Sequence, residues 1–264
     1  MIRLAITGVC GKMGSAILKL AAGDKDFHIT GAVEKKGHPM VGQPARRIVE
    51  DVPDDVMIVD DISKVINACD VVIDFTDPHT TLENFRLAGE KKKCIVIGTT
   101  GFSGDAVREI SDSKDVKAVM SPNMSIGMNL MFDVIDRVSK VLQDGYDIEI
   151  VEMHHRWKKD APSGTAMQLK EIVKAAQTGK QWEEVYGRKG ITGERKNEEI
   201  AVLGLRGGDI VGEHTVMYAG IGERLEITHR AYSRENFARG ALAAAKWIVR
   251  QAPGIYGMKD VLGL

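Results

Sequence analysis

The first half of the chain alternates short apolar runs with longer segments in which apolar residues recur every three or four positions. Apolar runs bounded by glycine, proline or polar residues predict buried strands, and the longer periodic segments predict helices. Strands are expected at 2–7, 27–34, 56–61, 70–76, 94–101 and 116–123. Helices are expected at 15–24, 77–92 and 103–114. Strands that alternate with helices predict an α/β fold with a doubly wound parallel sheet.

The pattern changes near residue 125. Residues 124–142 have the spacing of a long amphipathic helix, and 146–155 alternates isoleucines with acids, which predicts a half-solvated strand with its acids toward solvent. The stretch 200–231 predicts two or three strands with glycine turns, typical of an open, mixed sheet. A final apolar helix at 234–251 is of the kind that packs on a parallel sheet. We therefore expect two domains, with this last helix returning to the first.

Composition limits the possible partners. The apolar fraction is 44% and the charged fraction 28%, which is ordinary for a soluble globular protein. The net charge of −1 argues against nucleic acid or an anionic membrane as a partner. The three cysteines, Cys10, Cys69 and Cys94, are far apart and form no C-x-x-C pair, so neither a disulfide framework nor a metal site is expected. With no signal-like or membrane-spanning run, these features favour a cytoplasmic protein.

A glycine-rich loop, GVCGKMG at 8–14, follows the first predicted strand and opens the first helix. In a dinucleotide site Gly8 would allow the tight turn, Gly11 the approach of a pyrophosphate, and Gly14 close packing of helix on strand. The spacing G-x-x-G-x-x-G differs from the commoner G-x-G-x-x-G, so the loop alone also fits a turn without a ligand. Cys10, inside this loop, is better explained as a small filler than as a reactive thiol.

Glu34 strengthens the dinucleotide hypothesis. It ends the second strand, 20 positions after Gly14, where an acid accepts hydrogen bonds from the adenine ribose. Lys35 and Lys36 follow it and could meet a ribose 2′-phosphate or form a solvated turn, so NADH, NADPH or both are expected. The strand ends GTTG (98–101) and SPNM (121–124) would lie at the same edge of the sheet.

A basic run stands directly before another predicted helix. The segment 154–166 reads HHRWKKDAPSGTA. Five of its first six residues are basic or titratable: His154, His155, Arg156, Lys158 and Lys159. Pro162 and Ser163 mark a helix start, because proline is excluded from helix interiors and serine is a good N-cap. The first N–H groups of that helix, on Gly164 and Thr165, with the Thr165 hydroxyl, would form an anion cradle. Cations beside such a cradle predict a small anionic ligand, most simply a carboxylate.

The same run contains two groups that can move a proton. His154 titrates near neutral pH and is the expected acid/base, and Lys158 is a competent donor if it is desolvated beside other cations. His155 could instead be a packed histidine, Trp157 suits packing, and Asp160 could orient the loop.

The segment EMHHRWKKDAPSGTA, 152–166, resembles the signature of the 4-hydroxy-tetrahydrodipicolinate reductase family, E-x-H-H-x-x-K-x-D-x-P-S-G-T-A. The glycine loop, GTTG, residues 208–231 and the ending GIYGMKDVLGL are similar to the same family, so the resemblance spans the chain. It implies reduction of 4-hydroxy-tetrahydrodipicolinate, via dihydrodipicolinate, to tetrahydrodipicolinate in diaminopimelate and lysine biosynthesis, with NADH or NADPH as the cofactor.

The resemblance also implies the architecture. A Rossmann-like domain that binds the dinucleotide would comprise residues 1–125 and 236–264. A second α+β domain with an open mixed sheet, 126–235, would bind a small dicarboxylate and assemble a homotetramer.

Carried over by position, the acid/base histidine of the family falls on His154 and its proton-donor lysine on Lys158. Substrate-binding positions fall on His155, Gly164 and Thr165. Cofactor contacts fall on Gly8, Val9, Cys10, Gly11, Lys12, Met13, Glu34, Lys35, Gly98, Thr99, Thr100, Ser121, Pro122, Asn123 and Met124. Lys35 stands where many members carry an arginine, which grips a 2′-phosphate with two parallel bonds.

Two alternatives fit part of the pattern. Another two-domain nicotinamide dehydrogenase, acting on an amino or hydroxy acid, would share the glycine loop. A dinucleotide-sensing regulator without turnover would share it too, but would leave acid/base groups beside an anion cradle unexplained.

Overall fold

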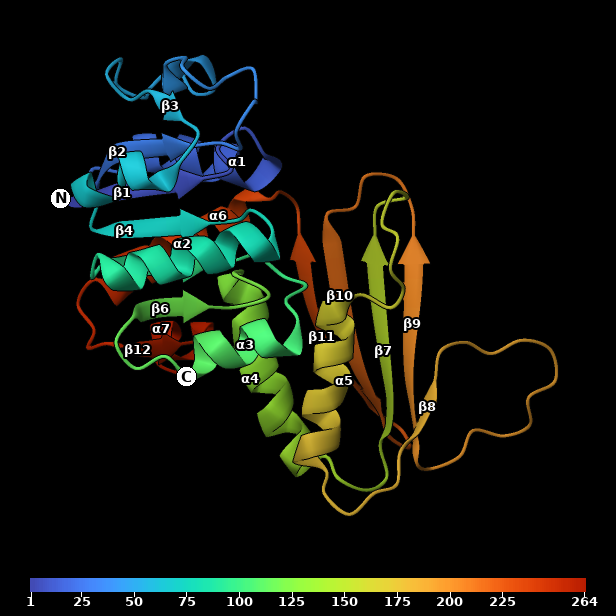
Figure 1. Cartoon of the computed structure of the whole chain (residues 1–264). Helices are drawn as coiled ribbons and strands as arrows, with labels where there is room; N and C mark the ends of the chain where they lie inside the picture. Colours follow the sequence, from blue (N-terminus) through green and yellow to red (C-terminus); the bar gives the residue numbers. More distant parts are fainter. The chain divides into compact units, whose positions relative to one another are not determined.

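The structure is a computed structural model that describes all 264 residues, and its chain forms two compact units (Figure 1). Unit 1 comprises Met1–Ile126 and Arg234–Leu264, and unit 2 comprises Gly127–Ser233. None of the helices combines the length and apolar character needed to cross a membrane.

Unit 1 contains a seven-stranded sheet in which every neighbouring pair is parallel. Its strands are β1 (Ile2–Thr7), β2 (Phe27–Val33), β3 (Ile58–Val59), β4 (Val71–Asp74), β5 (Cys94–Ile97), β6 (Lys117–Met120) and β12 (Gly254–Tyr256). The order β12-β6-β5-β4-β1-β2-β3 reverses direction between β1 and β4, which is the switch point of a Rossmann-like sheet. The predicted doubly wound fold is confirmed. Strand β12, only three residues long, was not predicted, because a run that short carries no periodicity.

Helices cover both faces of this sheet. One face packs against α1 (Lys12–Ala22) and α6 (Glu235–Ile248), and the other against α2 (Pro78–Glu90) and α3 (Gly104–Asp112). Alternation along β1 sends Leu4 and Ile6 into the first core and Ala5 into the second. The segment between β2 and β4 adds three short 3₁₀ turns at Ala45–Arg47, Ile62–Lys64 and Ile66–Ala68, and the chain ends in the short helix α7 (Met258–Leu262).

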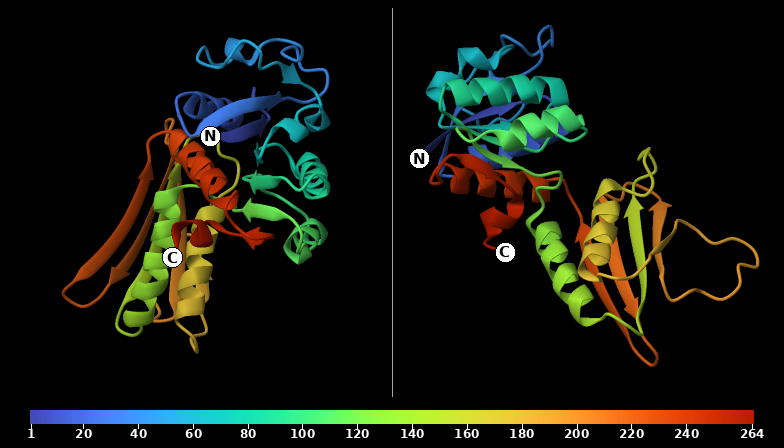
Figure 2. Two further views of the ribbon diagram at one scale, coloured as in Figure 1. Left: turned by 90° about the vertical axis from the view of Figure 1, so that its left-hand side faces the viewer. Right: turned by 60° about the horizontal axis from the view of Figure 1, so that its bottom comes forward.

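Unit 2 is built on an open mixed sheet, as predicted; it has five strands in the order β11-β10-β7-β9-β8. The strands are β7 (Asp147–His154), β8 (Glu183–Val185), β9 (Glu199–Arg206), β10 (Gly212–Ala219) and β11 (Arg224–Ala231). Strands β11, β10 and β7 are antiparallel neighbours, whereas β9 runs parallel to both β7 and β8. Helices α4 (Ile126–Val141) and α5 (Gly164–Ala176) pack on one face of the sheet and leave the other uncovered (Figure 2).

Strand β7 corrects one expectation. Its buried face carries Ile148 and Ile150 and then, at the same spacing of two, Glu152 and His154. The prediction that the acids of this segment face solvent is therefore wrong at Glu152, which has no exposed surface.

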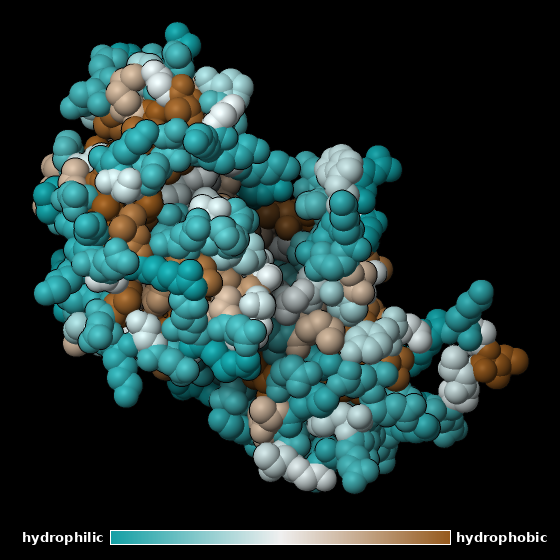
Figure 3. Space-filling model, in the orientation of Figure 1, coloured by the Kyte–Doolittle hydropathy of each residue, from teal (hydrophilic) through white to brown (hydrophobic).

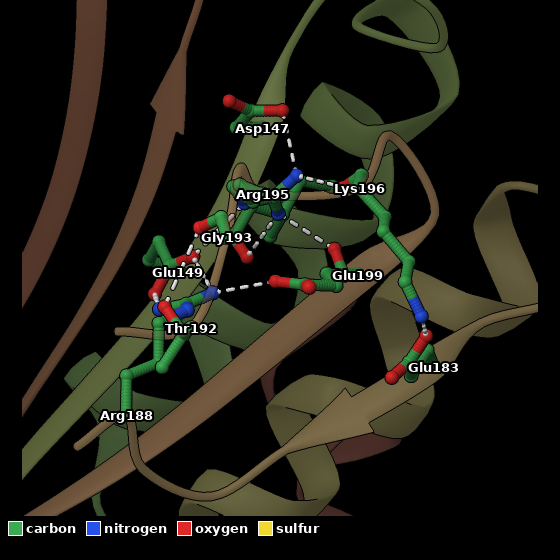
Figure 4. Close-up of polar contacts among 10 residues, drawn as sticks. Asp147, Glu149, Glu183, Arg188, Thr192, Gly193, Arg195, Lys196 and Glu199 are labelled. Atoms are coloured by element: carbon green, nitrogen blue, oxygen red, sulfur yellow. Dashed lines mark hydrogen bonds and ion pairs between the residues drawn. The ribbon is translucent and has the colours of Figure 1, made fainter. Parts of the chain in front are cut away.

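A long loop, residues 186–198, joins β8 to β9 and is held at its base by ion pairs (Figure 4). Arg188 donates to Glu149 on β7 and to Glu199 on β9, and Arg195 donates to Glu149 as well. Beyond this anchor Ile191 is fully exposed, and Figure 3 shows a hydrophobic spot at the end of the projecting loop.

Candidate functional site

The glycine loop joins β1 to α1 in unit 1. Gly8 has a left-handed backbone, with φ of +66°, which favours glycine. A Cβ on Gly14 would lie 2.0 Å from the Gly8 carbonyl oxygen, so only glycine lets the helix pack this closely on the loop. Gly11 is the N-cap of α1, and no side chain caps that helix. The first turn of α1 is thus suited to bind an external anion.

The carboxylate of Glu34 lies beside this loop. Its Oε2 accepts a hydrogen bond from the backbone N–H of Cys10 at 2.9 Å, and its Oε1 accepts one from the N–H of Lys35 at 3.0 Å. Burial, together with the Glu34 carboxylate, raises the pKa of the Cys10 thiol to about 11. The thiol is therefore protonated at neutral pH, in agreement with a filler rather than a nucleophile.

A cavity of about 610 Å³ opens at this edge of the sheet. It is lined by four of the predicted cofactor residues, Gly8, Gly11, Glu34 and Lys35, and by Lys36. Four further acids also line it: Asp60, Asp61, Asp77 and Glu83. The carboxylates on the wall can accept hydrogen bonds from ribose hydroxyls, and the two lysines can pair with a phosphate.

Beside the cavity, a buried carboxylate organises two strand ends. Asp74, at the end of β4, has no exposed surface and accepts bonds from the Thr76 N–H and from the hydroxyls of Thr76, Thr81 and Thr99. Its second oxygen accepts from Asn84 Nδ2 at 2.6 Å. The Thr99 hydroxyl, predicted to contact the cofactor, is thus engaged inside the protein.

The other predicted cofactor residues are placed differently. Gly98 lies against the ring of Phe75, since a Cβ there would come within 2.1 Å of it. Ser121 is buried and its hydroxyl donates to the Asn123 carbonyl at 2.8 Å. Val9 and Met124 are buried in the core of unit 1 rather than on the cavity wall. Lys12, Thr100 and Pro122 are exposed, and Met13 is partly exposed.

In unit 2, β7 delivers His154 to the start of the basic run. His154 Nδ1 lies 2.6 Å from Glu152 Oε2, and its ring packs edge-on against His214 at 5.3 Å. Burial lowers the pKa of His154, and this outweighs the opposing effect of Glu152. The imidazole is accordingly neutral at neutral pH. Burial also lowers the pKa of His214, to about 3.

The rest of the basic run forms a loop after β7. The Lys158 ammonium is 2.9 Å from Asp160 Oδ1, and this hydrogen bond lowers the pKa of Asp160. The sequence suggests that Asp160 orients the loop, and the structure pairs its carboxylate with the Lys158 ammonium. His155 is half-buried and its ring lies 5.8 Å from the ring of Trp157, which is largely exposed.

Helix α5 begins where the sequence predicts. Ser163 is its N-cap, and its hydroxyl accepts from the Ala166 N–H at 3.2 Å. Gly164, the first helical residue, is exposed, and no atom lies within 4 Å of the position a Cβ would take. The start of α5 therefore presents open backbone ten residues after His154, the catalytic candidate that ends β7.

Sequence reasoning missed three residues, one beside the cavity of unit 1 and two around His154 in unit 2. Glu152 and Asp74 are buried carboxylates, and Arg206 on β9 bonds to Glu152 through both terminal nitrogens. The signal for Glu152 was present, because it shares the spacing of two with Ile148 and Ile150. Nothing local in the sequence distinguishes Arg206 from a solvated strand end.

Unit 1 has a parallel sheet and a glycine loop that opens an uncapped helix, and unit 2 has acid/base groups beside a second helix start. Two-domain dinucleotide-dependent oxidoreductases have this architecture. Comparison with known proteins narrows this class. The family profile "Dihydrodipicolinate reductase, N-terminus" matches residues 2–124, and "Dihydrodipicolinate reductase, C-terminus" matches residues 127–262. The chain belongs to this family, the 4-hydroxy-tetrahydrodipicolinate reductases, which are oxidoreductases of lysine biosynthesis.

Full-length relatives carry the name of the same family. The 4-hydroxy-tetrahydrodipicolinate reductase of Trichlorobacter lovleyi is 49% identical over 267 residues, and that of Geotalea uraniireducens is 47% identical over 267 residues, each covering 100% of both chains. Among solved structures, the dipicolinate-bound dihydrodipicolinate reductase from Paenisporosarcina sp. TG-14 has a TM-score of 0.77 at 24% identity, covers 98% of this chain and 99% of its own, and supports the fold. The reductase resemblance is confirmed over the two alternatives, and membership implies a nicotinamide cofactor.

Proposed function

We propose that unit 1 holds NADH or NADPH at the glycine loop and that unit 2 holds a cyclic dicarboxylate at the start of α5. When bound, the reduced nicotinamide supplies the hydride that reduces a carbon of the dihydrodipicolinate ring. The observation that carries the proposal is the open start of α5 at Gly164, beside a neutral His154 and an oriented Lys158.

The residues of unit 1 fit the cofactor. The uncapped first turn of α1 suits a pyrophosphate, and Gly14 makes that turn accessible by letting the helix pack against the loop. Each Glu34 oxygen already accepts one backbone N–H and has capacity for one more bond, so the carboxylate suits the ribose diol of NADH. Lys35 and Lys36 on the same wall would meet the 2′-phosphate of NADPH. The other proposed cofactor contacts are the rest of the glycine loop, residues 8–13, and the strand ends at 98–100 and 121–124.

In unit 2, the N–H groups of Gly164 and Thr165 and the Thr165 hydroxyl would bind one carboxylate of the substrate. His155 and neighbouring cations would bind the other. Binding both carboxylates orients the ring, and orientation of the reacting atoms is the main way in which a protein accelerates hydride transfer. The proton that completes the reduction would come from Lys158 or His154, whose side chains stand at the same end of β7.

We further propose that four copies assemble through the mixed sheets. The sheet face opposite α4 and α5 is uncovered, and the anchored loop 186–198 presents the exposed Ile191 beside it. The expected mass in light scattering is four times 28.9 kDa. All three cysteines are free thiols, which suits the reducing cytoplasm where we place the enzyme.

The proposed function is tested by mixing the protein with reduced nicotinamide and enzymatically generated 4-hydroxy-tetrahydrodipicolinate. A fall in the absorbance of the reduced nicotinamide, in proportion to the substrate added and with both NADH and NADPH, supports the proposed function. Turnover that is unchanged in both Lys158→Ala and His154→Gln would refute the assigned proton-transfer roles.

A further inference from the structure

Glu152 occupies a space that two neighbouring strands leave open for it. On β9 the residue paired with Glu152 is Gly204, and a Cβ there would come within 3.0 Å of Glu152 Oε1. On β10 a Cβ at Gly212 would come within 3.0 Å of His154 Nε2. The carboxylate and the imidazole thus fit between two glycines, and larger residues at either glycine would displace them.

The carboxylate joins three elements. Its Oε1 accepts from the backbone N–H of Ser163 at 2.9 Å and from Arg206 Nη2 at 2.8 Å. Its Oε2 lies 2.6 Å from His154 Nδ1 and accepts from Arg206 Nη1 at 2.8 Å. One buried side chain therefore holds the ring of His154, the N-cap of α5 and the end of β9 together.

The bonding defines the tautomer of His154. An ionised carboxylate can only accept hydrogen bonds, so the short contact requires the imidazole proton to be on Nδ1. Burial alone would raise the pKa of Glu152, but the bonds from Arg206 and His154 outweigh it and the pKa is lowered, so the carboxylate stays ionised. The positive charges of Lys158 and Arg206 oppose a second proton on the ring.

We propose that Glu152 is the positioning residue of the site: it fixes the ring of His154 and holds the proton of the neutral imidazole on Nδ1, which leaves the lone pair of Nε2 as an acceptor. The inference rests on the proposed function of His154. It assigns the two proton-transfer groups different tasks. His154 accepts a hydrogen bond, and the ammonium of Lys158 donates the proton that completes the reduction, leaving a neutral amine that solvent reprotonates.

The first test is a double-mutant cycle on kcat. Glu152→Gln should lower kcat about 10- to 100-fold, within the range that a positioned acid or base contributes, and should leave the KM for reduced nicotinamide unchanged, because that cofactor binds unit 1. In a His154→Gln background, Glu152→Gln should lower kcat by less than about 2-fold, because the ring that Glu152 positions is already absent. Glu171→Gln removes an exposed, ion-paired carboxylate on α5 and is the matched control, with kcat unchanged.

The second readout is the pH profile. The groups that face His154 are Glu152 on its own strand, Arg206 on β9, His214 on β10, and Lys158 in the loop after β7. Loss of the Glu152 charge removes the one effect that raises the pKa of His154, so the acid limb of kcat should move to lower pH in Glu152→Gln. A lower plateau with an unmoved limb would indicate structural damage alone.

The outcomes separate the two hypotheses. Wild-type turnover of His154→Gln overturns the proposed function of His154. An impaired His154→Gln in which Glu152→Gln costs the same further factor as in the wild type overturns the positioning role. If Glu152→Gln does not fold, Glu152→Asp takes its place in the same cycle, because it retains the charge but withdraws the carboxylate from the ring. A loss of kcat that disappears in the His154→Gln background supports the positioning role. An additive loss of kcat overturns it.

Discussion

The substitution Asp74→Asn tests how the cofactor edge of unit 1 is held together. The carboxylate is fully buried and accepts five hydrogen bonds, at 2.6 to 3.3 Å, from two strand ends and from α2. A bond to a charged acceptor contributes about 1 kcal/mol more than a bond to a neutral one, so five bonds lose about 5 kcal/mol. An asparagine also no longer buries a charge, and this relief offsets part of the loss. We expect the free energy of unfolding of unit 1 to fall by about 2–4 kcal/mol.

The chain offers a direct assay for this change. Of its three tryptophans, Trp247 alone lies in unit 1, where its ring packs against Tyr256 at 5.0 Å. In a Trp157→Phe/Trp182→Phe background, Trp247 fluorescence during urea unfolding therefore reports unit 1. Asp77→Asn is the matched control, because asparagine caps α2 as well as aspartate does. A loss below about 1 kcal/mol for Asp74→Asn, or an equal loss for the control, would refute the reasoning.

Five further outcomes are expected. Lys158→Ala should lower kcat by about 100-fold or more with little change in the dissociation constant of NADH, as measured by steady-state kinetics and fluorescence titration. His154→Ala should lower kcat as well, and a fully active variant would remove the residue from the chemistry. Glu34→Ala should weaken NADH more than NADPH, because it removes an acceptor of the ribose diol; equal losses in titrations with the two cofactors would exclude that contact. Hydrogen bonds from two lysines and a tyrosine lower the pKa of Glu184 to about 2. Its contribution to stability is therefore present above about pH 4.5 and is lost as the pH falls toward 2. Between those pH values, thermal melts should show a smaller loss of stability for Glu184→Gln than for the wild type. Cys10 should react slowly with a thiol reagent at pH 8, because its pKa is about 11, and rapid modification of this residue would contradict the burial described.

The sequence predicted the parallel sheet well because its strands are buried on both faces and read as continuous apolar runs. It failed where local pattern carries no information. Strand β12 is three residues long and is stabilised by pairing with β6 far away in the sequence. Whether Val9 and Met124 would face the cavity or the core depends on how the strand ends turn, and spacing alone does not determine that.

Two parts of the candidate site in unit 2 were predictable to different degrees. The start of α5 follows from Pro162 and Ser163, since both residues have strong positional preferences at helix starts. The role of Glu152 depends on the pairing of β7 with Gly204 and Arg206, which are more than 50 positions away along the chain. Contacts of that kind are set by sheet register, and a single sequence does not record them.

We propose that the first turn of α5 holds an anionic ring while the first turn of α1 holds a dinucleotide. A crystal structure of the protein with NADH and pyridine-2,6-dicarboxylate tests it most directly. We expect one carboxylate at the N–H groups of Gly164 and Thr165, and the pyrophosphate at residues 8–13. A dicarboxylate bound elsewhere, with the start of α5 unoccupied, would contradict it.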